Sequence, residues 1–219
     1  MKKLNFIIKC GLALLLLSFY SCESWLNVTP SDRLSEEMLF NDREGFVKAL
    51  NGVYIELNTN ELYGRNLTAG ALDVMGQYYS VASSSHAFYN YGGLVYTGND
   101  EKALFDNMWQ KCYAVIACCN TIIEKCDERQ DVLPGVYYGL YKGEALALRA
   151  MLHLDMLRLF GPLTSELDKE SIPYQTNSDQ TVTPLLSGSE VVGLILDDLK
   201  NAVGLLKDTD PYFVEEEFS

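Results

Sequence analysis

The sequence predicts a mainly α fold in which long helices pair antiparallel, together with one irregular region rich in aromatic side chains. Two segments, about 100–126 and 136–160, carry apolar residues at helical spacing and are separated by a short turn. A third segment, 74–99, follows neither the helical nor the strand period. We therefore expect a scaffold of paired helices that carries an irregular loop region.

The first 21 residues are predicted to be a cleaved lipoprotein signal peptide. Lysines near the N-terminus precede an apolar run at 11–19, which is about half of the ~20 residues that span a bilayer. A small residue, Ser21, lies directly before Cys22, which is the pattern of bacterial lipoproteins whose cysteine thiol is diacylated. Ordinary secretion with an unmodified Cys22 is the alternative.

The mature chain, residues 22–219, is expected to form one helical domain. An extended tether at 23–30 precedes a segment with helical spacing, 34–58, in which Asn41 or Asp42 can cap the helix. A mixed connection then leads into the irregular region 74–99.

The two long helices that follow should pack as an αα-hairpin. One face of the first helix holds Trp109, Tyr113, Ile116, Asn120 and Ile123. A Leu-Pro-Gly turn at 133–135 separates the helices, and Gly161-Pro162 ends the second. A polar loop at 161–183 leads to a last helix at about 189–206.

The charge of the chain argues against nucleic acid as a partner. Asp and Glu number 30 against 17 Lys and Arg, so the formal net charge is −13, and it becomes −16 without the three lysines of the signal peptide. Phosphate binding needs a basic face, which this composition does not provide. The 48% hydrophobic content excludes a disordered chain, and 14 tyrosines indicate neutral partners.

No residue pattern indicates catalysis, a cofactor or a metal site. Cys112, Cys119 and Cys126 recur every seven residues, ~10.5 Å apart along a helix, which is too far for a disulfide, so we expect buried thiols. The sequence has no Gly-x-Ser-x-Gly nucleophile motif that could make His86 part of a catalytic triad. His153 lies in the middle of a helix and is expected to be a hydrogen-bonded core residue. The pair Asp197-Asp198 is interpreted as part of a solvated helix face.

The irregular region is the candidate binding site. Residues 74–99 contain no Asp, Glu, Lys or Arg, and their tyrosines lie among Ser, Gly and amide residues. Sugars stack their C–H faces on aromatic rings and direct their hydroxyls to amides. The candidate glycan-binding residues are Tyr89, Tyr91, Tyr78, Asn90 and Gln77. In an extended stretch Tyr89 and Tyr91 would share one side, ~6.6 Å apart. The alternative is that these rings fill a small core.

Several motifs resemble those of the SusD/RagB family. They include the Trp-Leu-Asn-Val tether after Cys22, the Ala-Leu-Asn-Gly-Val-Tyr helix ending at Tyr54, and Trp109-x-x-x-Tyr113 leading to Cys119-Asn120. The most specific is the run 141–161, which reads Tyr-Lys-Gly-Glu-Ala-Leu-Ala-Leu-Arg-Ala and continues to Leu-Phe-Gly. The similarity covers nearly all of 22–208.

The resemblance implies an outer-membrane, surface-exposed lipoprotein of Bacteroidetes that binds glycans and covers a TonB-dependent transporter. The fold it implies is a set of tetratricopeptide-like antiparallel helix pairs. Within that scaffold Trp109, Asn120, Glu144 and Arg149 are expected to be structural. The expected partners are therefore a neutral oligosaccharide or polysaccharide, the transporter, and the membrane through the lipid anchor.

Family members are typically more than twice as long as this chain. A second interpretation is therefore a scaffold or truncated fragment of a transporter-lid subunit without sugar affinity of its own. A third interpretation, an exported hydrolase, is disfavoured by the lack of a catalytic motif.

Overall fold

The computed structural model describes residues 36–179 and 182–210. The expected signal peptide and the lipidation site Cys22 lie outside the described residues. Within the described ranges every regular element is a helix, apart from one isolated antiparallel bridge between Glu170 and Ser187. The prediction of a mainly α fold is confirmed.

The segment 34–58, which was expected to form one helix, forms two helices in the structure. The short α2 (Glu36–Leu39) ends before a tight turn, and α3 (Arg43–Leu57) begins after it. Asp42 caps α3, because its Oδ1 accepts a hydrogen bond of 2.9 Å from the backbone N–H of Gly45. Gly45 is needed at this junction, since a Cβ there would lie 1.5 Å from the carbonyl oxygen of Leu39.

The αα-hairpin is formed by α6 (Asn99–Glu128) and α7 (Tyr137–Phe160), joined through the 3₁₀ turn η2 (Gln130–Val132). On the predicted inner face of α6, Ile116, Asn120 and Ile123 are buried. Gly135 turns the chain with a φ of +65°, a conformation that glycine adopts without strain. The prediction of this pair is confirmed, with ends within three residues of those expected.

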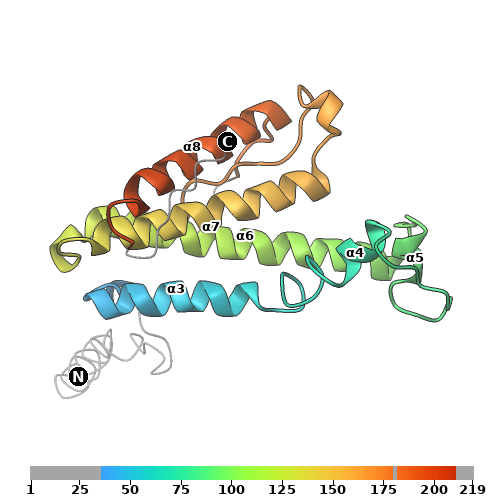
Figure 1. The fold of residues 1–219 in the computed structure, drawn as a ribbon, viewed down its shortest axis with the longest axis horizontal. Coiled ribbons are helices and arrows are strands. Elements are labelled where there is room, and N and C mark those ends of the chain that lie inside the picture. The colour runs from blue at the N-terminus through green and yellow to red at the C-terminus, as the bar shows by residue number, and fades with distance from the viewer. Residues whose placement is uncertain (1–35, 180–181, 211–219) are drawn as a thin grey trace, which may run out of the picture. The chain divides into compact units, whose positions relative to one another are not determined.

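The last helix, α8 (Gly188–Leu206), packs on α7. Its N-terminus carries a capping box, in which the side chains of Ser187 and Glu190 each accept a backbone N–H of the other. Figure 1 shows α8 at one edge of the array, with α7 and α6 between it and α3. The connection from α7 contains η3 (Thr164–Glu166).

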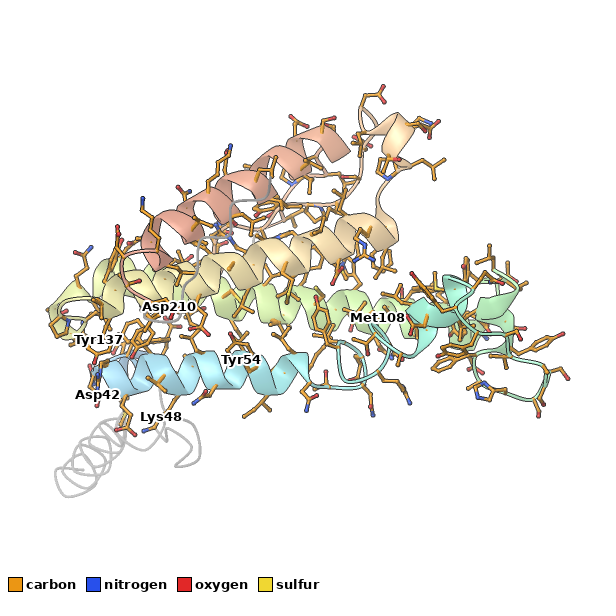
Figure 2. The ribbon with its side chains drawn as sticks, in the orientation of Figure 1. Asp42, Lys48, Tyr54, Met108, Tyr137 and Asp210 are labelled. Atoms are coloured by element: carbon orange, nitrogen blue, oxygen red, sulfur yellow. The ribbon has the colours of Figure 1, made fainter. Side chains whose placement is uncertain are left out.

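Side chains fill the spaces between these helices (Figure 2), and Met108 lies fully buried among them. The cysteines of α6 are free thiols; Cys112, Cys119 and Cys126 are buried, as expected. Burial raises the pKa of Cys119 and of Cys126 to about 12, so these thiols stay protonated. Cys118 is exposed, one residue out of the heptad register. No helix in the described ranges combines the length and apolarity needed to cross a membrane.

Candidate functional site

The irregular region 74–99 lies beside the N-terminal end of α6 (Figure 1). It begins at the end of the short helix α4 (Ala71–Met75) and contains the short helix α5 (Tyr89–Gly92). Tyr91 anchors α5. Its ring is 2% exposed and meets Phe105 of α6 edge-on, with 6.0 Å between ring centroids. Phe88 and Tyr96 complete this cluster around Tyr91. The charge-free segment and Phe105 of α6 therefore build a small aromatic core together.

This burial corrects the expected two-ring platform. Residues 89–92 form a helical turn and not an extended stretch, so side chains two positions apart point about 160° away from each other. Tyr89 is 42% exposed while Tyr91 faces the core. The prediction that both rings share one accessible side is therefore wrong. Side chains two positions apart lie on the same side of a strand, whereas in a helix they point to nearly opposite sides.

A cavity of about 360 Å³ opens between α5 and the segments on either side of it. Three candidates, Gln77, Tyr89 and Asn90, line this cavity together. The others that line it are Tyr79, Ser80, Val81, Gly92, Gly93 and Val95. Tyr78 does not join them: it is 83% exposed and lines a separate hollow with Leu72 and Arg158. The structure thus gathers part of the predicted set and separates Tyr78 and Tyr91 from it.

Tyr79 is a cavity residue that the sequence reasoning did not select. Its hydroxyl donates to the backbone carbonyl of Ala69, and it lies 3.3 Å from the carbonyl of Gly70. These contacts orient the ring toward the cavity wall beside Tyr89. The one sequence signal for Tyr79 is that it follows Tyr78. Adjacent side chains face different ways, so at most one of these two tyrosines could join the site.

The two amides of the cavity are held in fixed orientations. Gln77 Nε2 donates to the carbonyl oxygens of Gly92, at 2.9 Å, and Val74, at 3.3 Å. Asn90 Nδ2 donates to the buried Glu101 carboxylate at 2.7 Å. Within the described residues the side-chain oxygens of both amides accept no hydrogen bond, so each is available to a hydroxyl donor.

Backbone strain marks both sides of the cavity. Gln77 has a φ of +60° and Leu94, next to Val95, has a φ of +55°, although neither is glycine. Such conformations are uncommon and persist where the surrounding contacts enforce them, often at binding sites. Every lining residue is neutral at pH 7. The cavity therefore offers tyrosine rings and hydrogen-bond acceptors without charge.

A separate polar cluster holds the helices α6, α7 and α8 to the loop before α8. Arg149 of α7 donates to Asn120 Oδ1 at 2.8 Å and to both carboxylate oxygens of Asp198. The Asn120 amide in turn donates to the carbonyls of Gln175 and Asn177. These contacts are consistent with the structural roles expected of Arg149 and Asn120. The interpretation of Asp198 as solvated is wrong, because that side chain faces α7 and pairs with Arg149.

His153 is a core residue of this cluster, as expected. Its Nδ1 lies 2.9 Å from the carbonyl of Arg149, and its Nε2 accepts the backbone N–H of Gln175 at 3.1 Å. Desolvation by burial lowers the pKa of His153 to about 4, so the ring is neutral at pH 7. His86, by contrast, is an exposed loop residue whose ring packs near Phe88.

Comparison with known proteins decides the family. The family model described as "Starch-binding associating with outer membrane", SusD-like, matches residues 24–216. The chain belongs to the SusD-like family. SusD-like protein P38 of Formosa agariphila is 28% identical over 200 residues, which are 83% of this chain and 34% of P38. SusD-like protein P2 of the same organism is 26% identical over 94% of this chain and 38% of P2.

A solved SusD superfamily structure from Bacteroides fragilis shares the fold of this SusD-like chain. The TM-score is 0.62 at 20% identity, over 74% of this chain and 39% of that protein. The prediction of tetratricopeptide-like helix pairs is confirmed by this likeness. The SusD-like chain spans only about a third of the length of the curated relatives that it matches.

Proposed function

We propose that this SusD-like chain is a non-enzymatic glycan-binding part of an outer-membrane lipoprotein, and that its cavity beside α5 binds a neutral oligosaccharide. The family description supports a carbohydrate ligand and the outer membrane. The observation that carries the proposal is the neutral cavity itself, which lies in a chain with 30 acidic residues yet is lined by none of them. A sugar fits such a surface, because its hydroxyls need acceptors and its ring needs an apolar platform.

Within this site each group has a role. The exposed ring of Tyr89 is the platform for a C–H face of the sugar, with Tyr79 flanking it. The side-chain oxygens of Gln77 and Asn90 accept sugar hydroxyls, and the contacts of their amide nitrogens keep them in place. Tyr91 acts indirectly, because its buried ring fixes α5 on α6. Tyr78 is outside this site.

The wider role we propose follows the family. A diacylated Cys22 anchors the protein in the outer membrane facing the exterior, and the bound glycan passes to a TonB-dependent transporter that the protein covers. The second candidate is a scaffold part of a transporter-lid subunit that binds no sugar alone, since the chain spans only about a third of the curated relatives that it matches.

The test is calorimetry of the protein lacking residues 1–21 against a panel of neutral polysaccharides. Tyr89→Ala should weaken binding about tenfold, equivalent to ~1.4 kcal/mol, because one stacking ring is lost. Tyr78→Ala is the matched control, since it removes a more exposed tyrosine outside the cavity and should leave affinity unchanged. Binding should hardly vary with salt, because a neutral ligand releases no counterions.

Two results would reject the proposed site: full affinity in Tyr89→Ala, or a steep dependence on salt. Absence of binding to every polysaccharide would favour the scaffold candidate. The folded state of each variant is checked by circular dichroism, because the fold is mainly helical.

A further inference from the structure

A second cavity, of about 670 Å³, is lined by residues of α6, α7 and α8 together. Its volume falls within the range of small-molecule sites, which is about 300–1,000 Å³. It shares no lining residue with the cavity beside α5, so the two are separate. Ile123, Leu146 and Leu205, one from each of the three helices, give it an apolar wall.

The charged residues that line this second cavity are mainly basic. They are Lys142, Arg149 and Lys200, with Asp198 as the one carboxylate. This is the reverse of the whole chain, in which 30 acidic residues outnumber 17 basic ones. Arg149 already holds Asp198 in an ion pair, so these two residues form a neutral part of the wall. We call this space the basic cavity, because the charges left over are those of the two lysines.

Lys142 is held in place with one N–H to spare. Its Nζ donates to Asp127 Oδ1 at 2.6 Å and to the hydroxyl oxygen of Tyr138 at 3.1 Å. Burial works against the charge of Lys142, but these two partners outweigh it and raise the pKa above its ordinary value. The side chain is therefore an ammonium at pH 7. Since an ammonium has three N–H donors, one remains for a ligand.

The other polar groups of the basic cavity also have unused donors. The Nζ of Lys200 lies 3.6 Å from its ion-pair partner Asp197, which is longer than a hydrogen bond. Within the described residues the side chains of Asn201 and Thr176 make no hydrogen bond. The cavity therefore presents two ammonium groups, an amide and a hydroxyl, and most of their unused hydrogen-bonding capacity is donor capacity.

A donor-rich cavity of this kind suits an oxyanion. Hydrogen bonds from an ammonium to a carboxylate or phosphate are roughly twice as strong as those between neutral groups. Asp127 and Asp197, the acidic partners of the two lysines, are not among the lining residues. The apolar wall beside these donors matches a ligand whose anionic group is attached to a carbon body.

We propose that the basic cavity binds a small organic anion through its carboxylate or phosphate group. Lys142, Lys200 and Asn201 donate to the oxygens of that group, and the carbon body lies against the apolar wall. Arg149 is not a ligand in this site, because its guanidinium is engaged by Asp198 and Asn120. The proposal does not depend on the proposed glycan binding, which concerns the cavity beside α5.

The test is calorimetry of the protein lacking residues 1–21 with benzoate, benzamide and inorganic phosphate. Benzoate and benzamide have nearly the same shape and differ in charge, so benzamide should bind at least about tenfold more weakly. Raising the ionic strength from ~0.01 M to ~1 M shortens the screening length from ~30 Å to ~3 Å, so the affinity for benzoate should fall severalfold. Tighter binding of phosphate than of benzoate would identify a phosphoryl group as the preferred anion, and the reverse a carboxylate.

Substitutions then locate the bound anion. Lys142→Met keeps the side-chain stem and removes the ammonium, so it should weaken benzoate binding about tenfold. Asn201→Asp has the same shape but adds a negative charge, and it should weaken binding by a similar factor. Lys48→Met is the matched control: Lys48 lies on α3, is 59% exposed and pairs with Glu44, so affinity should not change. If Lys142→Met lowers the thermal midpoint, Lys200→Met tests the same cavity at an exposed position.

Four results would overturn the proposal. Neither benzoate nor phosphate binds, or benzamide binds as tightly as benzoate. In the third case Lys142→Met, Lys200→Met and Asn201→Asp all retain full affinity. In the fourth case Tyr89→Ala abolishes benzoate binding, which would place the anion in the cavity beside α5. None of the first three results bears on glycan binding, because Lys142, Lys200 and Asn201 do not line that cavity.

Discussion

Arg149 of α7 and Asp198 of α8 form a two-pronged ion pair in which Nε and Nη2 each donate to a different carboxylate oxygen at 2.7 Å. Their side chains are 7% and 10% exposed. The hydroxyl of Tyr174 donates to the same carboxylate at 2.6 Å, which joins the loop before α8 to both helices. The pair therefore helps to fix how α8 lies on α7.

Asp198→Asn should lower the free energy of unfolding by about 3 kcal/mol, because it leaves a buried guanidinium without its counter-charge. Asp197→Asn is the matched control at the next position. Its side chain is 66% exposed and only 3.6 Å from Lys200, so the change should stay below about 0.5 kcal/mol. Urea unfolding of both variants measures the difference, and equal losses would contradict the structural role of the pair.

His153 should make stability depend on pH between about 6.5 and 4. Burial depresses the pKa of this histidine to about 4 in the folded chain, so the unfolded chain binds more protons across that window. Stability is therefore fully present above about pH 6.5 and falls as the pH drops, by about 3 kcal/mol in all. Urea unfolding at several pH values checks this. His153→Gln should flatten the profile in that window, whereas substitution of the exposed His86 by Gln should not change it.

Trp109→Ala should destabilise the hairpin of α6 and α7. The indole packs on Tyr113, with 4.7 Å between ring centroids, and meets Phe160 of α7 edge-on at 4.9 Å. Removing a large aromatic from such a contact costs about 3 kcal/mol. Trp109→Phe retains a ring and should lose much less. A thermal midpoint unchanged by the alanine substitution would show that Trp109 does not support this interface.

Cys22→Ala should abolish lipidation. Expressed in a bacterium that processes lipoproteins, the full chain should incorporate labelled palmitate and partition into detergent, because acyl chains bury apolar area. Cys10→Ala is the control, since it removes a cysteine upstream of the expected cleavage point. Label that persists in Cys22→Ala would contradict the assignment of the acylated residue.

The long helices could be predicted closely because local signals define them. Gly161 followed by Pro162 ends α7, and Ser187 with Glu190 begins α8, and each of these signals acts within a few residues. The buried face of α6 could be predicted from the helical spacing of its apolar residues alone. Family motifs could then assign Arg149 to the scaffold, although they did not name its partner.

The burial of Asp198 could not be predicted, because its partner is 49 residues away in the sequence. Asp197 and Asp198 are chemically alike, and only the packing of α8 on α7 distinguishes them. The same holds for the region 74–99, where contacts with Phe105 on α6 decide that Tyr91 is buried and Tyr89 is open. A charge-free segment without period carries no local signal for either outcome.

The unequal exposure of the α6 cysteines makes this protein suited to single-site labelling. In the described ranges Cys118 is the thiol that reaches solvent, whereas Cys112, Cys119 and Cys126 are enclosed and held in the unreactive protonated form. A maleimide dye would attach there on the native protein lacking residues 1–22, because that change removes both Cys10 and Cys22. The number of dyes attached per chain would then report the unfolding of α6, since melting the helix frees three further thiols to react.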